Sequence, residues 1–198
     1  MAWIVKVGVK AYLTQSEMEN NATEFYGYFN SKGFTIASVA GMLGNLEQES
    51  NINPGMKQSA SASSGWGLIQ WTPSRNLTDY AISHGTDWAN GEIQTQLMWD
   101  EIINGYGGQW KPKPSLGYGY TGAEFSQLTD VTDACKAYLY ERERAGEAAL
   151  NQRLTYASNW YKYLTGVTPP TPPTPPTPPT PTKRKRMPVW MMCSPFFK

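Results

Sequence analysis

The sequence predicts one mainly helical α+β domain, followed by a proline-rich linker and a short C-terminal tail. Apolar side chains recur at helical spacing in several stretches of residues 1–166, and one short stretch rich in glycine and tryptophan resembles a β segment. Nine of the 15 prolines lie in a Thr-Pro repeat at residues 168–182. A chain of 198 residues that is 40% hydrophobic can form one well-packed domain.

A first helix is predicted to begin with a capping box of Ser16 and Glu19, and Gly33 is a natural stop for it. Its buried face is expected to carry Met18, Ala22, Phe25 and Phe29. A second helix is expected from about Ile36 to near Asn53-Pro54, since proline disfavours helix in the residue before it. Its apolar stripe comprises Ile36, Val39, Leu43 and Leu46.

The sequence predicts a short β-like segment and four more helices in the rest of the domain. The β-like segment lies within residues 55–72, and residues 105–122 are rich in Gly, Pro and Tyr, which is typical of a loop. The further helices are expected at residues 74–84, 92–104, 130–143 and 145–164.

The linker and tail are predicted to be separate from the domain at residues 1–166. The linker is residues 167–182, and its repeat at residues 168–182 should form an extended polyproline-II spacer, roughly 45 Å long at ~3.1 Å per residue. An SH3-type ligand is the weaker interpretation. Residues 183–198 combine a four-residue basic run with an apolar, aromatic end that is too short to span a bilayer. We expect this tail to anchor in a partner protein or to contact an anionic membrane surface.

Composition excludes several classes of function. Residues 183–198 carry a charge of +5, which leaves the rest of the chain at −4 and argues against a nucleic-acid-binding protein. His84 is the only histidine, and Cys135 and Cys193 lack metal-site spacing, so we expect no metal and no cofactor. No stretch approaches the ~18 apolar residues of a spanning helix, and the N-terminus does not read as a secretory signal.

The end of the second helix carries two candidate acids, Glu47 and Glu49. Both lie near the borders of the apolar stripe, about 200° apart, so they cannot act together on one bond and periodicity does not choose between them. Partial burial of a carboxyl group raises its pKa, which suits a general acid at neutral pH. Two solvated glutamates at a helix end fit the same spacing.

The segment Gly65-Trp-Gly-Leu-Ile-Gln-Trp71 has the composition of a sugar-binding turn. Its glycines permit a tight turn with close backbone approach. Gln70 offers an amide for sugar hydroxyls, and Trp66 and Trp71 offer flat faces for sugar rings. A purely structural core position for Trp71 is the alternative.

Together, these motifs resemble the phage tail lysozyme family, as found in the N-terminal domain of tail-tip peptidoglycan-degrading proteins of phi29-like podophages. The resemblance rests on Gly-Asn-Leu-Glu-Gln-Glu49-Ser-Asn-Ile-Asn-Pro54 followed by Gly65-Trp-Gly-Leu-Ile-Gln-Trp-Thr-Pro73. Further matches are Leu13-Thr14, Tyr140-Glu141-Arg142 and Trp160-Tyr161-Lys162, so it covers about residues 12–166.

The resemblance implies a lysozyme-like fold of the goose-type lysozyme or lytic transglycosylase kind, in which a glutamate ends a helix beside a small β wall. It implies Glu49 as the catalytic acid, in preference to Glu47, and Gln70 and Trp71 as substrate contacts. Trp66, Asn53 and Glu141 are further candidates for substrate binding. A buried pair of Glu141 with an arginine is an equally good interpretation of that position.

The implied activity is that of a muramidase, which cleaves the β-1,4 bond between N-acetylmuramic acid and N-acetylglucosamine. No Asp or Glu lies between Glu49 and Asp79, so the β wall cannot supply a carboxylate nucleophile. Hydrolysis by a water held by Gln70, backbone groups or a distant acid is favoured, and lytic transglycosylation stays open. A non-catalytic glycan-binding tail component and a membrane-active tail peptide are the competing hypotheses.

The expected partner is peptidoglycan, with other phage tail proteins bound through residues 183–198 and no nucleic acid. The expected location is the virion tail, or the cell wall after release from the host cytoplasm at lysis. Similar tail proteins continue into a zinc endopeptidase domain, whereas this sequence has one His and no metal-binding pattern. We therefore expect cleavage of glycan and not of peptide cross-links.

Overall fold

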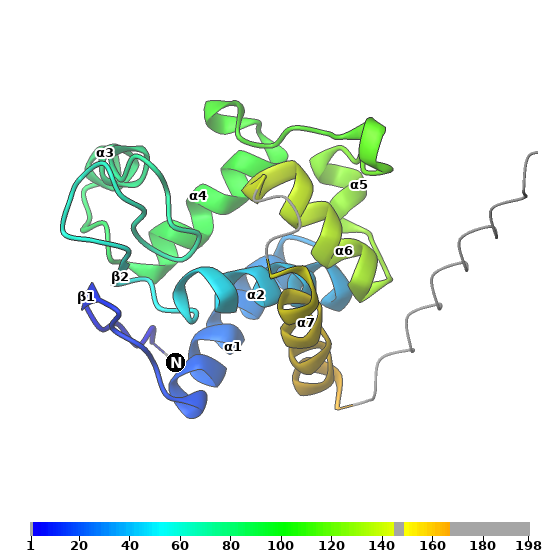
Figure 1. The fold of residues 1–198 in the computed structure, drawn as a ribbon, viewed down its shortest axis with the longest axis horizontal. Helices are drawn as coiled ribbons and strands as arrows, with labels where there is room; N and C mark the ends of the chain where they lie inside the picture. The colour runs from blue at the N-terminus through cyan, green and yellow to red at the C-terminus, as the bar shows by residue number, and fades with distance from the viewer. Residues whose placement is uncertain (1, 145–148, 167–198) are drawn as a thin grey trace, which may run out of the picture.

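The computed structural model describes residues 2–144 and 149–166, so the predicted linker and tail lie outside the described residues. The described part is mainly helical with a small two-stranded sheet, as predicted (Figure 1). The main elements are β1 (Gly8–Val9), α1 (Gln15–Ser31), α2 (Ile36–Ser50), β2 (Met56–Lys57), α3 (Arg75–Ser83), α4 (Gly91–Ile103), α5 (Gly122–Ser126), α6 (Val131–Tyr138) and α7 (Leu150–Thr165).

Helix α1 begins two residues earlier in its capping box than predicted. Thr14 is the N-cap, and its side chain and that of Glu17 bond reciprocally to the backbone, so the predicted box of Ser16 and Glu19 is wrong. Glu17, the partner of Thr14 in this box, also accepts a hydrogen bond from Lys6 Nζ at 2.6 Å. This bond fixes the N-terminal segment against the helix and favours Thr14 over Ser16 as the N-cap. The predicted stop at Gly33 is confirmed by its φ of +85°. The predicted buried face is confirmed for Met18, Ala22, Phe25 and Phe29.

Helix α2 is the buried centre of the domain. It packs against α6 and α7, and Gly41 and Gly44 allow this close approach. A Cβ atom at Gly41 would lie 2.6 Å from the backbone nitrogen of Cys135, and one at Gly44 would lie 2.6 Å from that of Ala157. The helix ends at Ser50, earlier than the predicted Asn53-Pro54, because the next residue, Asn51, adopts a left-handed conformation.

The β region is smaller than an ordinary sheet but lies where the sequence predicts it. β1 and β2 pair in parallel, with Gly8 opposite Met56. Isolated antiparallel bridges join Lys57 to Trp66 and Trp66 to Trp71, which folds the Gly/Trp segment into a tight turn. The N-terminal strand is an element that the sequence analysis did not predict.

The remaining helices follow the predicted ranges, with three differences. The helix predicted at 145–164 begins at Leu150, after Ala149 in a left-handed conformation, and residues 145–148 lie outside the described residues. The short helix α5 lies just after the predicted loop and was not expected. The helix predicted at 130–143 is α6 followed by a π-helical turn, Leu139–Glu143, which ends at Arg144 in a left-handed conformation. In Figure 1, α4 runs between α3 and β2 on one side and α5 and α6 on the other. Within the described residues, no helix is both long and apolar enough to span a bilayer.

Candidate active site

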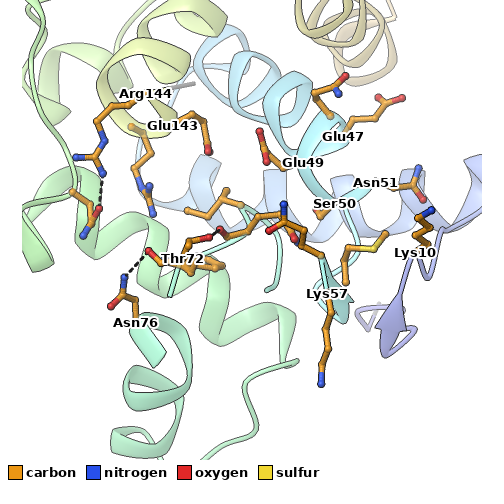
Figure 2. A pocket seen from close by; sticks show the side chains of 18 of the residues that line it. Lys10, Glu47, Glu49, Ser50, Asn51, Lys57, Thr72, Asn76, Glu143 and Arg144 are labelled. Carbon is orange, nitrogen blue, oxygen red and sulfur yellow. Dashed lines mark hydrogen bonds between the residues drawn. The ribbon is translucent and has the colours of Figure 1, made fainter. Parts of the chain in front are cut away.

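A pocket of about 540 Å³ opens where the C-terminal end of α2 meets the β region and the π-helical turn. The lining is largely polar and charged, and Figure 2 shows its side chains converging from these three parts of the chain. Two of the candidate acids, Glu47 and Glu49, line it, as do Gln70 and Trp71. The pocket therefore combines the helix end and the turn that the sequence analysis singled out.

Glu49 lies at the end of α2 with its carboxylate partly open to the pocket, and 21% of its side chain is exposed. Arg153 Nη2 of α7 donates to Glu49 Oε1 at 2.5 Å, and this guanidinium is itself buried. Arg153 Nη1 also donates to Asn45 Oδ1 at 3.0 Å, so two residues of α2 orient the arginine. Asn45 is in turn fixed by its bond to the backbone oxygen of Cys135, at 3.1 Å.

Glu47 is engaged differently from Glu49. Trp160 Nε1 donates to Glu47 Oε2 at 2.7 Å, and burial raises the pKa of this carboxyl while the indole bond lowers it. The two glutamates thus contact different residues of the same helix, α7, and both line the pocket.

Gln70 and Trp71 form the part of the pocket wall that comes from the β region. Gln70 Nε2 bonds to the backbone oxygen of Gly67 at 2.7 Å, and its backbone has a φ of +52°. Trp71 is almost fully buried, and its Nε1 donates to Glu101 Oε1 at 2.9 Å. Arg142 Nε donates to the other oxygen of Glu101 at 2.8 Å. Glu101, behind the wall, therefore positions two residues that line the pocket.

The π-helical turn places a further acid, Glu143, in the pocket. Figure 2 shows its side chain directed toward Glu49 across the cavity. Glu143 Oε1 is buried and has no hydrogen-bond partner among the described residues. Burial, opposed by Arg142 and aided by the nearby Glu49 carboxylate, raises the pKa of Glu143 to about 8.

Three predicted substrate-binding residues lie elsewhere than in the pocket lining. Trp66 packs against Trp88, with ring centroids 4.9 Å apart, and Lys57 Nζ lies 3.9 Å from its ring centroid. Asn53 is fully buried, and its Nδ2 binds the backbone oxygen of Lys6 at 2.7 Å.

The third of these residues, Glu141, is not among the residues that line the pocket. It is fully buried and accepts from the backbone N–H of Tyr120 at 2.8 Å. The arginine beside it in sequence, Arg142, bonds to Glu101 rather than to Glu141.

Left-handed backbone is concentrated around this pocket. Among the described residues, six that are not glycine have positive φ, and four of them line the pocket: Lys10, Asn51, Gln70 and Arg144. Each such conformation costs free energy that the surrounding structure must offset, and strained residues cluster at functional sites. The distribution supports a functional role for the cavity.

The pocket offers carboxyl, guanidinium, ammonium and hydroxyl groups and several side-chain amides. Within the described residues, no group of three or more His, Cys, Asp and Glu side chains is placed to hold a metal ion. The sequence analysis missed Arg153, Glu101 and Glu143. The first two come from helices far from residue 49 in sequence, and Glu143 depends on a π-helical turn, which no sequence pattern marks.

Comparisons with known proteins match most of the helical domain. The model of the family described as phage tail lysozyme matches residues 20–164. The chain is also 32% identical over 160 residues to "Morphogenesis protein 1" of Bacillus phage B103, an alignment that covers 79% of this chain. That alignment covers 42% of the relative, so the chain spans less than half of its length. Because the family match extends over most of the sequence, the chain belongs to the phage tail lysozyme family.

Proposed function

We propose that this protein is a muramidase that cleaves peptidoglycan glycan strands between N-acetylmuramic acid and N-acetylglucosamine, with Glu49 as the general acid. Membership of the phage tail lysozyme family supports peptidoglycan as the substrate. The expected likeness to goose-type lysozymes and lytic transglycosylases is part of the same proposal.

The position of Glu49 carries this proposal. Its carboxyl group is partly exposed at the end of a buried helix and opens into a polar pocket. A glycosidase needs a carboxyl group in that setting to protonate the leaving oxygen. Gln70 lines the same pocket, so a sugar bound there would meet an amide and an acid together.

Mass spectrometry of the soluble products from purified peptidoglycan tests the proposal. The full chain, Glu49→Gln and a control, Glu92→Gln, are compared; Glu92 is exposed near the start of α4, outside this pocket. Products with reducing-end muramic acid, formed by the full chain and the control but not by Glu49→Gln, are expected. Unaltered product formation by Glu49→Gln would overturn the role of this residue.

The same products separate the two competing activities. Anhydro-muramic ends would identify a lytic transglycosylase acting on the same bond. No products from the unaltered chain on several wall types would favour a glycan-binding tail component without activity.

We also propose that the protein acts as part of the virion tail, with release at lysis as the alternative. The family and the name of the phage B103 relative support an association with tail assembly. The proposed contact through residues 183–198 lies outside the described residues. Detection of the chain in purified virions, and its loss from them when residues 183–198 are deleted, are the expected results.

A further inference from the structure

Glu143 is the acid of the pocket that the proposed mechanism has not yet used. Glu143 is the last residue of the π-helical turn. The next residue, Arg144, has a φ of +56° and ends the turn. Arg144 Nη2 binds Gln109 Oε1 at 2.9 Å, which fixes the end of this turn. The turn thereby directs Glu143 into the same cavity as Glu49 (Figure 2).

The environment of Glu143 differs from that of Glu49 in a way that matters for proton transfer. Arg153 holds Glu49 in an ion pair, whereas Glu143 Oε1 is buried without a hydrogen-bond partner among the described residues. A buried carboxyl oxygen in a polar pocket needs a partner, and a water or a sugar hydroxyl is what the cavity can offer.

Charged and titratable groups surround Glu143 from every element packed against it. Those that influence it or are influenced by it are Glu49 of α2, Glu101 of α4, Tyr138 of α6, Arg142 of its own turn and Arg153 of α7. Burial has the largest effect and, with the two carboxylates, raises the pKa of Glu143 to about 8 against the two guanidinium groups. Glu143 therefore binds a proton more tightly than an ordinary carboxyl group does, whereas Glu49 is ion-paired with Arg153.

We propose that Glu143 is the second carboxyl group of the reaction, and that it shares a single proton with Glu49 across the pocket. This inference rests on the proposed function. Two facing carboxyl groups with one proton between them can serve as acid and base in turn. The second carboxyl group thus comes from the π-helical turn rather than from the β wall, which has no acid.

Glu49, when it holds the shared proton, gives it to the bridging oxygen as the bond from that oxygen to the muramic acid C1 breaks. A water then bonds to C1 and gives one proton to the Glu143 carboxylate. This leaves Glu143 protonated and Glu49 ionised beside Arg153, which is the arrangement of the free site. Return of the proton to Glu49 prepares the next cycle.

The other acids near the pocket fit this role less well. Glu47 is held by the indole of Trp160. Both oxygens of Glu101 are occupied, by Trp71 and Arg142, and its side chain is 3% exposed. Glu141 lies outside the pocket lining.

The test measures kcat and kcat/KM from pH 5 to 10 on soluble labelled glycan strands. It compares the full chain with Glu143→Gln, Glu143→Asp and the control Glu92→Gln. We expect Glu143→Gln to lower kcat by about 100-fold or more, because general acid–base groups contribute at least that much. Glu143→Asp should keep more activity than Glu143→Gln, and Glu92→Gln should match the full chain.

The pH profile supplies a measurement that a purely structural role would not change. Activity of the full chain should fall as pH rises through about 8, where the shared proton is lost. The residual activity of Glu143→Gln should lack this decline. A Glu143→Gln variant within about threefold of the full chain and with the same profile would overturn the inference, because general base catalysis is worth far more.

Circular dichroism establishes whether Glu143→Gln is folded. If Glu143→Gln is not folded, the pH profiles of the full chain and of Glu143→Asp test the inference instead. A fall in activity near pH 8 in the full chain that moves to another pH in Glu143→Asp supports the inference. Constant activity of the full chain from pH 7 to 9.5 overturns it. Absence of glycan cleavage by the full chain would overturn the proposed function and this inference together. An active full chain with an unchanged Glu143→Gln variant overturns only the inference.

Discussion

Arg153 Nη2 of α7 donates to Oε1 of Glu49 at the end of α2, at a distance of 2.5 Å. The two residues are 104 positions apart in sequence, so this contact exists only when the whole domain has formed. The arginine is 4% exposed and the glutamate 21%, which means that the cation is buried while the acid reaches the pocket. The stability of the fold and the setting of the proposed catalytic acid are thereby linked through one ion pair.

Replacement of Arg153 by lysine is expected to lower both the stability of the fold and the glycan-cleaving activity. Lysine cannot bind Asn45 and Glu49 together through a planar fork, so we expect a loss of about 1–3 kcal/mol in the free energy of unfolding. Glycan cleavage should fall because Glu49 loses its orientation. Urea unfolding and product formation measure the two effects. Arg75→Lys, at the exposed start of α3, is the matched control, and equal stability of the two variants would contradict the prediction.

The close approach of α2 and α7 leads to a second prediction. A Cβ at Gly44 would lie 2.6 Å from backbone atoms of Ala157 and Arg153, and backbone cannot yield as a side chain can. Gly44→Ala should therefore destabilise the protein by about 2 kcal/mol or more, as overpacked cores do, and should also reduce activity by displacing Arg153.

Gly27→Ala is the control for this substitution. Gly27 lies within α1, and a Cβ there would meet no atom within 4 Å. Alanine is the better helix former, so Gly27→Ala should be neutral or raise stability by up to about 1 kcal/mol. Thermal unfolding of both variants makes the comparison, and a Gly44→Ala variant as stable as Gly27→Ala would exclude the steric explanation.

The sequence predicted the parts of the site that depend on local pattern. Helical spacing located α2, and glycine and tryptophan composition located the turn that carries Gln70. The spacing of Glu47 and Glu49 could not show which carboxyl meets Arg153, because that arginine comes from another helix. The register of the chain after Tyr138 was also hidden, since a π-helical turn shifts each later side chain around the axis. Glu141 was singled out by the resemblance of Tyr140-Glu141-Arg142 to the family, and no local pattern singled out Glu143.

The corrected capping box gives a third prediction. The bond from Lys6 Nζ, followed by that from the backbone N–H of Thr14, lowers the pKa of Glu17 to about 2. An acid with a lowered folded-state pKa stabilises the fold above its unfolded value near 4.5, and the stabilisation disappears as pH falls toward 2. Glu17→Gln should therefore be less stable than the full chain at pH 7 and should approach it at low pH.

Glutamine can still complete a capping box, so this substitution isolates the charge of Glu17. Glu19→Gln is the control, because Glu19 bonds to Gln15 and not to the N-terminal segment. Chemical denaturation at several pH values measures both. A larger loss at pH 7 in Glu19→Gln than in Glu17→Gln would restore the capping box that the sequence suggested.

The buried carboxyl of Glu141 gives the last prediction, with the opposite dependence on pH. Burial raises its pKa to about 7, above the ordinary 4.5, so the folded state binds a proton more tightly than the unfolded chain does. Stability from this group is therefore complete below pH 4.5 and declines as pH rises toward 7, by up to about 1.4 kcal/mol per pH unit. Glutamine keeps the acceptor for the Tyr120 N–H without titrating, so Glu141→Gln should gain stability relative to the full chain as pH rises from 5 to 7. Glu92→Gln should follow the full chain, and a constant difference between Glu141→Gln and the full chain would show that Glu141 is not protonated in the folded protein at pH 5.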